Sequence, residues 1–456
     1  MNKRWYYLAL AIILLGIPLH QPLLVIIGLL VLLIVLLTDA WSTYCLRDLH
    51  YRRQLSEQRV LFGEQVLLSF SIENAKLLPL PWVEVEDNIP NTLVFKGHRP
   101  RIGLRSNTAV VESLFSPGWY ERITRNYSIQ CNTRGVHAFG PTTLRSGDVF
   151  GFVTREASIS NIQYLLVYPL VVPITRFGLP ARCPFGDQRA PRRLLEDPSR
   201  VIGVRDYSYG DDLRRVHWKA TARTMELQSK IYQATTTFTV VLFLNVLPRL
   251  DIHDYGVHPE LQELAICAAA SIADWSINEG YAVGLYANTM MYMPEISLTS
   301  SEEPRAREQE EQRSPEEKIG QMMSRRRIHI PPSSNEEQRK RIMEVLARIQ
   351  SYYGTSIEEV ILAERTRLPA GATVVVVTSS ISELLLDALA RVRRAGHAVT
   401  ILFVGDAAPS VRFPGITVHH IGGEETWKAL EALYDSASED EESMTQKPEV
   451  LAGIQL

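Results

Sequence analysis

The chain has 456 residues, which exceeds one ordinary hydrophobic core and predicts two or three domains. Hydrophobic residues make up 46% and charged residues 22%, as in globular proteins, and the formal net charge of -3 excludes a general attraction to nucleic acid. The four cysteines lie far apart without a CxxC pair, so no zinc knuckle or disulfide framework is indicated.

Two apolar runs open the chain. Trp5 to Leu19 and Leu23 to Leu37 carry no charge, and the polar turn His20-Gln21-Pro22 separates them. Each run would give about 22 Å of helix against a hydrocarbon core of roughly 30 Å, so flanking aromatic residues and local thinning must help. We expect a two-span transmembrane hairpin over residues 1–40, with spans at about 5–20 and 22–38, and the lipid bilayer as a partner.

Basic residues flank this segment on both sides. Lys3 and Arg4 precede it, and Arg47, Arg52 and Arg53 follow it within an expected basic juxtamembrane segment, residues 41–56. The positive-inside rule then places both ends of a hairpin in the cytoplasm and predicts a multi-pass inner-membrane protein with a cytoplasmic body. The alternatives are a cleaved signal peptide, a hairpin buried in a soluble core, and a body outside the cytoplasm.

Residues 57–172 alternate short apolar runs with turn residues. Val66 to Ile72, Trp82 to Val85, Tyr127 to Cys131 and Tyr164 to Tyr168 have the length and composition of strands. Repeated short strands without helical periodicity predict an antiparallel β-sandwich.

The second half of the chain changes pattern. Residues 173–236 are expected to be a connector, and residues 237–435 alternate apolar strands with amphipathic helices, which predicts an α/β doubly wound domain with a parallel sheet. Residues 295–340 are expected to be a charged insertion, either a solvated loop or an exposed helix, with partner binding as the alternative. Residues 436–456 are expected to be an acidic disordered tail.

Opposite charges and aromatic residues are concentrated between Arg205 and Arg223. Asp211 follows a glycine and can cap a helix, and Arg214 lies one turn before Trp218, a spacing that permits cation–π contact. The favoured hypothesis is a structural docking segment between domains. The catalytic alternative makes His217 a base oriented by Asp211 or Asp212, but no nucleophile or phosphate cradle accompanies them.

This stretch resembles the bacterial family that carries domain of unknown function 58. The resemblance uses an Arg-x-Tyr, Gly-Asp, Arg-x-x-x-Trp-Lys progression around a histidine, matched here by Arg205, Tyr207, Gly210, Asp211, Arg214, His217, Trp218 and Lys219. Upstream, the segments 133–141 and 147–151 are similar to the family's strand-turn region. Downstream, the α/β part resembles a von Willebrand factor type A domain, and the family's usual two N-terminal spans agree with the apolar runs.

Type A domains often hold a divalent cation in an Asp-x-Ser-x-Ser loop after the first strand. At the corresponding positions this chain has Asn245, Leu247 and Arg249, so the resemblance implies a degenerate site without metal or cofactor. A transition-metal alternative remains in the next few residues, where a hydrolase site would use Asp251, His253, Asp254 and His258. No GxxxxGK[ST], HExxH, GxSxG or dinucleotide glycine fingerprint occurs in the sequence.

Together these observations favour a membrane-anchored, non-enzymatic scaffold that binds other proteins. The family resemblance implies an association with MoxR-type AAA+ ATPases and a part in assembling a cell-envelope complex. The alternative is a metal-dependent hydrolase that uses the loop from Asp251 to His258.

Overall fold

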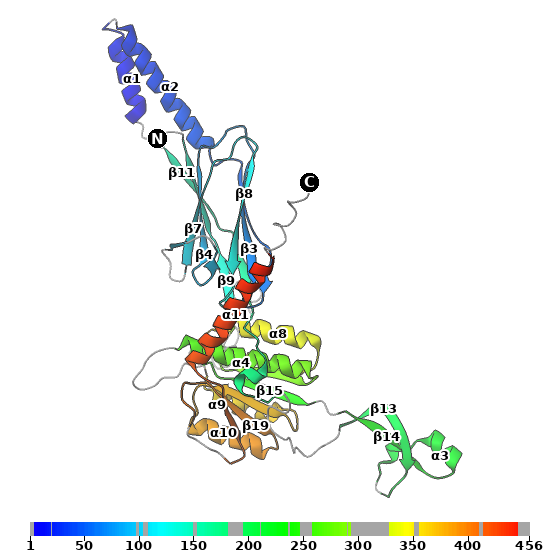
Figure 1. The fold of residues 1–456 in the computed structure, drawn as a ribbon. Helices are drawn as coiled ribbons and strands as arrows, with labels where there is room; N and C mark the ends of the chain where they lie inside the picture. Colours follow the sequence, from blue (N-terminus) through cyan, green and yellow to red (C-terminus); the bar gives the residue numbers. More distant parts are fainter. Residues whose placement is uncertain are drawn as a thin grey trace, which may run out of the picture. The chain divides into compact units, whose positions relative to one another are not determined.

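The computed structural model describes most of the chain. The described residues are 4–19, 21–96, 100–103, 108–148, 153–180, 195–209, 211–235, 238–246, 258–289, 291–292, 328–350, 355–409 and 414–445. They divide into two compact units, whose main segments are Met1–Leu170 for the first and Val171–Met293 with Thr299–Ala429 for the second. Figure 1 shows the elements of both units.

Two apolar helices begin the first unit, α1 (Arg4–Gly16) and α2 (Pro22–Tyr44). They lie side by side (Figure 1), with Gly16 against Val25 and Gly28 against Ile13. By length and composition, Pro22–Trp41 is long enough to cross a membrane, whereas the apolar part of α1, Trp5–Gly16, is shorter. Among the described residues there is therefore one candidate span, where the sequence predicted two. A helix of 13 residues extends about 20 Å, which is too short for a full hydrocarbon core.

Strands β1 to β12 form the β-domain (residues 49–170). The strand orders of its three sheets are β1-β3-β8-β5, β11-β10-β4-β7-β6 and β2-β12-β9. The strands are β1 (Leu49–Leu55), β2 (Arg59–Val60), β3 (Gln65–Asn74), β4 (Val83–Pro90), β5 (Val94–Phe95), β6 (Arg101–Ile102), β7 (Thr108–Phe115), β8 (Arg122–Gln130), β9 (Gly135–Phe139), β10 (Thr142–Gly147), β11 (Thr154–Ile159) and β12 (Gln163–Val167).

One hydrophobic core joins these sheets. Alternate residues of β3 point into it, and Val66, Leu68, Phe70 and Ile72 are fully buried. Residues of β4, β7, β8, β9, β10 and β12 contribute to the same core. The period-two alternation that predicted strands in the sequence therefore matches the buried face of β3.

The β-domain begins earlier than the sequence suggested. β1 lies inside the segment 41–56 that was expected to be juxtamembrane, and it pairs antiparallel with β3 along its whole length. Arg53 of β1 is buried and forms an ion pair with Asp87, so it cannot count among the free positive charges beside a membrane. The sequence prediction was misled because a basic residue inside a strand looks the same as a basic residue in a linker.

The signature stretch folds as a separate module within the expected connector, residues 173–236. After the short 3-10 helix η1 (Ile174–Phe177), strands β13 (Leu195–Asp206) and β14 (Gln228–Thr235) form a two-stranded antiparallel sheet. The 3-10 helix η2 (Leu213–Arg215) and helix α3 (Trp218–Thr224) connect the two strands. Register shifts interrupt the pairing of β13 with β14, which explains why no regular period was visible in the sequence.

A six-stranded sheet of order β17-β16-β15-β18-β19-β20 forms the α/β domain. Its strands are parallel except β17, which runs antiparallel to β16. The elements are β15 (Thr239–Leu244), α4 (Pro259–Asn278), β16 (Ala282–Ala287), β17 (Ile328–Ser333), α8 (Glu336–Ala347), α9 (Ile357–Glu364), η3 (Arg365–Arg367), β18 (Thr373–Thr378), α10 (Glu383–Arg394), β19 (Ala398–Phe403), β20 (Thr417–His420) and α11 (Glu424–Thr445).

Helices cover both faces of this sheet. α4 and α8 lie on one side and α9 and α10 on the other (Figure 1), where α9 and α10 pack on Val241 and Phe243 of β15. Coverage of both faces explains why every residue of β18 is buried. Local signals mark both ends of α10: the Ser382 hydroxyl accepts the Leu385 amide at its start, and Gly396, with φ of +93°, follows its end.

Two expected irregular segments are partly regular. β17 and the first residues of α8 lie within the segment 295–340 that was expected to be an insertion, and Ile328 and Ile330 of β17 are buried against β16. Residues 301–327, which carry most of the charge of that segment, lie outside the described residues. α11 continues into the expected acidic tail as far as Thr445, because glutamate is a good helix former even in a highly charged segment, and residues 446–456 lie outside the described residues.

His137 is a buried histidine of β9 whose protonation opposes folding. Its Nε2 lies 2.8 Å from the Thr133 carbonyl oxygen, to which it donates, and its Nδ1 lies 3.2 Å from the Thr92 hydroxyl. Burial lowers the pKa of His137 below its ordinary value of 6.5. The unfolded chain therefore binds a proton more readily than the folded chain, and the contribution of His137 to stability is present above pH 6.5 and lost as the pH falls.

We expect the free energy of unfolding to fall below pH 6.5 by up to about 1.4 kcal/mol per pH unit more in the wild type than in His137→Gln. Urea unfolding at several pH values between 5 and 8 measures this difference. His50→Gln, at an exposed position of β1, is the matched control and should keep the wild-type slope. An equal pH dependence in His137→Gln and the wild type would contradict the expectation.

Candidate functional site

Polar side chains gather at the carboxyl edge of the parallel sheet. Asn245 follows β15, Asn288 follows β16, and Thr378 ends β18. In the sheet, β16 lies next to β15 on one side and β18 lies next to it on the other. The connection after β15 therefore runs in one direction and the later connection to β18 runs in the opposite direction, so the strand order reverses at β15. In open α/β sheets, ligands bind in the crevice at such a reversal. This edge is therefore the first place to look for a binding site.

A continuous chain of hydrogen bonds links these residues. The Asn288 side chain accepts the Val246 amide at 2.9 Å and donates to Asn245 Oδ1 at 2.8 Å. Asn245 donates to Thr378 Oγ1 at 3.0 Å, and the Thr378 hydroxyl donates to the Ser380 carbonyl at 2.7 Å. Asn288 and Thr378 are completely buried, and Asn245 nearly so. The amide groups thus satisfy one another across three strands.

The chemistry of this cluster differs from that of a cation site. Hard divalent cations take carboxylate oxygens, whereas Asn245, Asn288 and Thr378 supply neutral groups that already bond to one another. The positions of Leu247 and Arg249, which the sequence singled out beside Asn245, lie outside the described residues. The sequence identified Asn245, but it did not identify Asn288, which carries no motif of its own.

Of the four residues in the transition-metal alternative, His258 is the one within the described residues. It lies immediately before α4, and its Nδ1 is 2.9 Å from Glu424 Oε1 at the start of α11. Asp251, His253 and Asp254 lie outside the described residues. Within the part of the chain that the structure describes, no three His, Cys, Asp or Glu side chains are grouped as metal ligands.

In the signature module, Asp211 organises the loop that follows β13. Its carboxylate accepts a hydrogen bond from Arg205 Nη2 at 2.7 Å and from the Ser208 amide at 3.1 Å. The hydroxyl of Tyr207 donates to the Asp211 carbonyl at 3.0 Å. The Ser208 amide and then the Arg205 guanidinium lower the pKa of Asp211. The residues of the Arg-x-Tyr and Gly-Asp parts of the signature therefore fix the shape of this turn, with Gly210 itself outside the described residues.

Capping contacts replace the catalytic pairing that the sequence allowed. Asp212, not Asp211, caps a helix: it accepts the Arg214 amide at 3.0 Å at the start of η2. His217 Nδ1 accepts the Ala220 amide at 3.0 Å and caps α3. His217 is thus occupied as a cap, and in the described part of the chain it forms no hydrogen bond with Asp211 or Asp212, which the catalytic alternative would require.

The expected contact between Arg214 and Trp218 is also not formed. In the described part of the chain, the cation–π contacts are Arg47 with Tyr44 and Arg125 with Phe115. Arg214 belongs to η2, whereas Trp218 begins α3, so the two residues do not share one helix. The four-residue spacing that permits this contact within a helix therefore does not apply.

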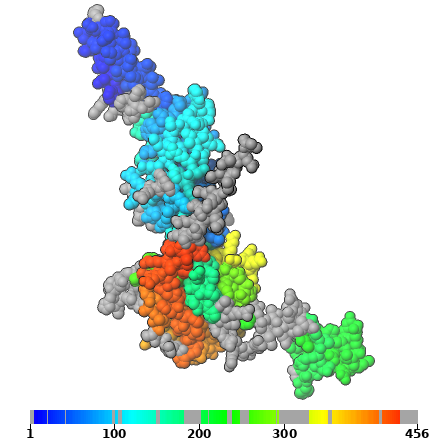
Figure 2. Space-filling view, in the orientation of Figure 1, coloured from blue at the N-terminus to red at the C-terminus, as the bar shows by residue number. Residues whose placement is uncertain are grey.

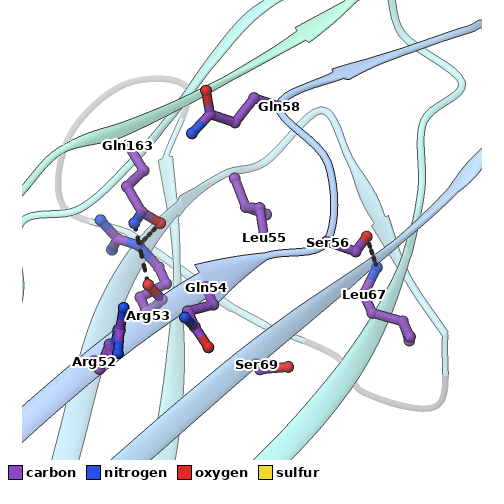
Figure 3. Close-up of a pocket in the computed structure, with 9 residues that line it drawn as sticks. All are labelled: Arg52, Arg53, Gln54, Leu55, Ser56, Gln58, Leu67, Ser69 and Gln163. Carbon is purple, nitrogen blue, oxygen red and sulfur yellow. Dashed lines mark hydrogen bonds between the residues drawn. The ribbon is translucent and has the colours of Figure 1, made fainter.

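A polar groove of about 500 Å³ lies beside β1 in the β-domain. Figure 3 shows its lining, which is Arg52, Arg53, Gln54, Leu55, Ser56, Gln58, Leu67, Ser69 and Gln163. Arg53 and Gln163 exchange hydrogen bonds here, since Gln163 Nε2 donates to the Arg53 carbonyl at 3.1 Å and Arg53 Nε donates to Gln163 Oε1 at 3.3 Å. The guanidinium of Arg53 is used inside the β-domain, which leaves Arg52 as the cation that faces solvent.

The fold and these sites define a class of protein: an α/β domain preceded by a β-domain and an apolar helix. Residues 203–300 match the family described as "Protein of unknown function DUF58". This match begins within β13 and continues through η2, α3 and β14 to the first strand of the parallel sheet, β15, and it includes the stretch from Arg205 to Lys219 that carried the resemblance.

A curated relative is "Uncharacterized protein YeaD" of Bacillus subtilis (strain 168), 23% identical over 212 residues. The matched region is 46% of this chain and 51% of the relative, so the chain spans about half the length of that protein.

Among solved structures, the CARDB domain of the PF1109 protein of Pyrococcus furiosus is 12% identical, with coverage of 26% of this chain and 92% of that one and a TM-score of 0.19. A fragment of alpha-2-macroglobulin from Escherichia coli is 16% identical, and the match covers 27% of this chain and 17% of that one, with a TM-score of 0.20. Scores this low carry no argument about fold or function.

Proposed function

We propose that this protein is a membrane-anchored, non-enzymatic scaffold whose α/β domain is a type A-like module that binds other proteins without a metal ion. The observation that carries the proposal is the hydrogen-bonded chain of Asn288, Asn245 and Thr378 at the carboxyl edge of the sheet. A neutral, buried and mutually satisfied cluster stands where the family resemblance would place a cation. Because these groups bond to one another, the edge can be stable without an ion.

The proposed anchor is α2, with α1 packed beside it as the second arm of a hairpin. α1 is short for a full crossing, so the hairpin requires local thinning of the bilayer. Lys3, Arg4 and Arg47 are the charges that favour a cytoplasmic body. By family analogy, the scaffold works with a MoxR-type AAA+ ATPase in assembling a cell-envelope complex at the inner membrane.

We expect the purified full-length chain to contain no stoichiometric divalent metal and to gain no thermal stability from added Mg²⁺. An ion that binds only the folded state would stabilise it by RT ln(1 + [L]/Kd), where [L] is the free ion concentration, and so would raise the melting temperature. Asn245→Asp should lower the free energy of unfolding by about 1–3 kcal/mol, because aspartate lacks the amide donor that reaches Thr378. Metal analysis by mass spectrometry and urea unfolding measure the two outcomes.

The matched control is Asn126→Asp, at an exposed position of β8 where the side chain only accepts a hydrogen bond from Ser69. This change should alter stability by no more than about 0.5 kcal/mol. Stoichiometric zinc, manganese or magnesium that is lost in His253→Ala would overturn the scaffold proposal in favour of the hydrolase. Equal free energies of unfolding for Asn245→Asp and Asn126→Asp would show that the hydrogen-bonded chain does not stabilise the sheet edge, and the scaffold proposal would lose its main support.

A further inference from the structure

The signature module has very little hydrophobic core of its own. Of the side chains described between residues 201 and 231, Val216 is the one apolar side chain that is fully buried. The other two buried side chains in that range, Gln228 and Ser229, are polar. A two-stranded hairpin is marginally stable unless it packs against something else. The module is therefore built to be completed by contact with another surface.

Large apolar side chains of the module face solvent instead. Trp218 is 68% exposed, Leu213 67% and Met225 89%, and Tyr209 at the tip of the first turn is fully exposed. Figure 2 shows the module as one continuous green surface. Aromatic side chains and methionine are enriched in the buried centres of protein interfaces. Their concentration here indicates an unoccupied docking surface.

The segment that carries Leu213, Trp218 and Met225 has a net positive charge, with Asp212 and Glu226 at its two borders. From Leu213 to Met225 there are four cations and no acidic residue. Arg214, Lys219 and Arg223 form no ion pair with any described residue, in contrast to Arg205, which is neutralised by Asp211. An occupant must therefore bring negative charge of its own.

The geometry points to an acidic protein surface rather than a lipid surface or a second copy of this chain. α3 has only seven residues, and Trp218 is its single large apolar side chain, so it lacks the long apolar face that inserts into a bilayer. Two copies of the module would bring like charges together across a symmetric interface. We propose that residues 203–231 dock, through Trp218 and its neighbours, onto a partner protein with an apolar cleft surrounded by Asp and Glu.

This inference rests on the proposed scaffold function and names the surface that scaffold would use. The experiment replaces Trp218 of the full-length chain with the photoreactive residue p-benzoylphenylalanine, irradiates living cells, and maps the crosslinked peptides by mass spectrometry. We expect an adduct with another protein at a peptide that borders a cluster of acidic residues. The triple change Arg214→Glu, Lys219→Glu and Arg223→Glu should reduce its yield about tenfold or more, equivalent to about 1.4 kcal/mol of binding.

The matched control is Lys340→Glu with Arg341→Glu on the exposed side of α8, which should leave the adduct yield within about twofold. If the triple variant does not accumulate, raising the ionic strength of isolated membranes should lower the wild-type yield instead. The proposal is overturned if the crosslinked adducts form only with lipid, within the same chain or with a second copy of it. It is also overturned if neither the charge reversal nor added salt reduces the adduct yield. Such a failure leaves the metal test of the sheet edge unaffected, so the two proposals fail separately.

Discussion

Arg53→Met is expected to lower the free energy of unfolding of the β-domain by about 3–5 kcal/mol, because it leaves a buried carboxylate without its cation. The side chain of Arg53 is 2% exposed and that of Asp87 is 0% exposed. Nη1 of Arg53 lies 2.6 Å and 2.9 Å from the two carboxylate oxygens of Asp87. Substitution of the arginine removes both contacts at once.

The pair belongs to a larger buried network. The hydroxyls of Tyr51 and Thr142 also donate to Asp87, at 2.9 Å and 2.8 Å. Nη2 of Arg53 donates to the Phe139 carbonyl at 2.7 Å. Burial, followed by the nearby carboxylate of Asp87, raises the pKa of Tyr51, so this tyrosine remains a hydrogen-bond donor at neutral pH. Without Arg53, the carboxylate of Asp87 and the carbonyl of Phe139 would each lose a hydrogen bond while remaining buried, which is unfavourable.

The local backbone is shaped to admit the guanidinium. A Cβ atom at Gly140 would lie 3.0 Å from Arg53 Nη2 and 2.6 Å from the Asn161 carbonyl oxygen, and Gly140 has φ of +104°. Only glycine fits both the close approach and this backbone conformation without strain. The segment 133–141, which resembled the family's strand-turn region, therefore forms part of the wall around Arg53.

Urea unfolding of the single and double variants tests this network. Arg101→Met, which breaks the exposed pair of Arg101 with Glu112, is the control and should cost no more than about 1 kcal/mol. In the double variant Arg53→Met with Asp87→Leu, the free energy of unfolding should fall by less than the sum of the decreases in the two single variants, because neither charge is then buried without a partner. If Arg53→Met lowers the free energy of unfolding as little as the control does, the buried pair does not support the fold.

Removal of residues 1–38 is expected to transfer the protein from the membrane fraction to the soluble fraction. The residues of α2 that face outward are large and apolar, and Leu23, Ile26, Leu33 and Leu37 are each more than half exposed. Apolar surface of this extent is unfavourable in water and favourable in lipid. The deletion keeps Trp41, which packs against the core of the β-domain.

Centrifugation after cell breakage and an alkaline wash measures the distribution. Leu33→Arg, in the middle of α2, should weaken insertion by about 3–4 kcal/mol, whereas Leu33→Ile should leave it unchanged. A full-length chain recovered from the soluble fraction would contradict the anchor. A reporter joined to the C-terminus then distinguishes a cytoplasmic body from an external one.

The sequence by itself determined the elements whose signals are local. The apolar runs of β15, β18 and β19 are strands, and the apolar residues after Pro22 form one long helix. Ser382 and Gly396 mark the start and the end of α10. The stretch from Arg205 to Lys219 also carried enough information to indicate the family that residues 203–300 match. These features follow from periodicity, capping and motif spacing, which are properties of neighbouring residues.

Only the tertiary structure decided which distant residues meet. Arg53 and Asp87 are 34 positions apart, and Asn245 contacts residues 43 and 133 positions away. No local pattern distinguishes a basic residue that will be buried from one that will face a membrane, and nothing around Asn288 indicated its role. The burial and pairing of these polar groups depend on strand order and register, which are fixed when the sheets assemble and not by the sequence near each residue.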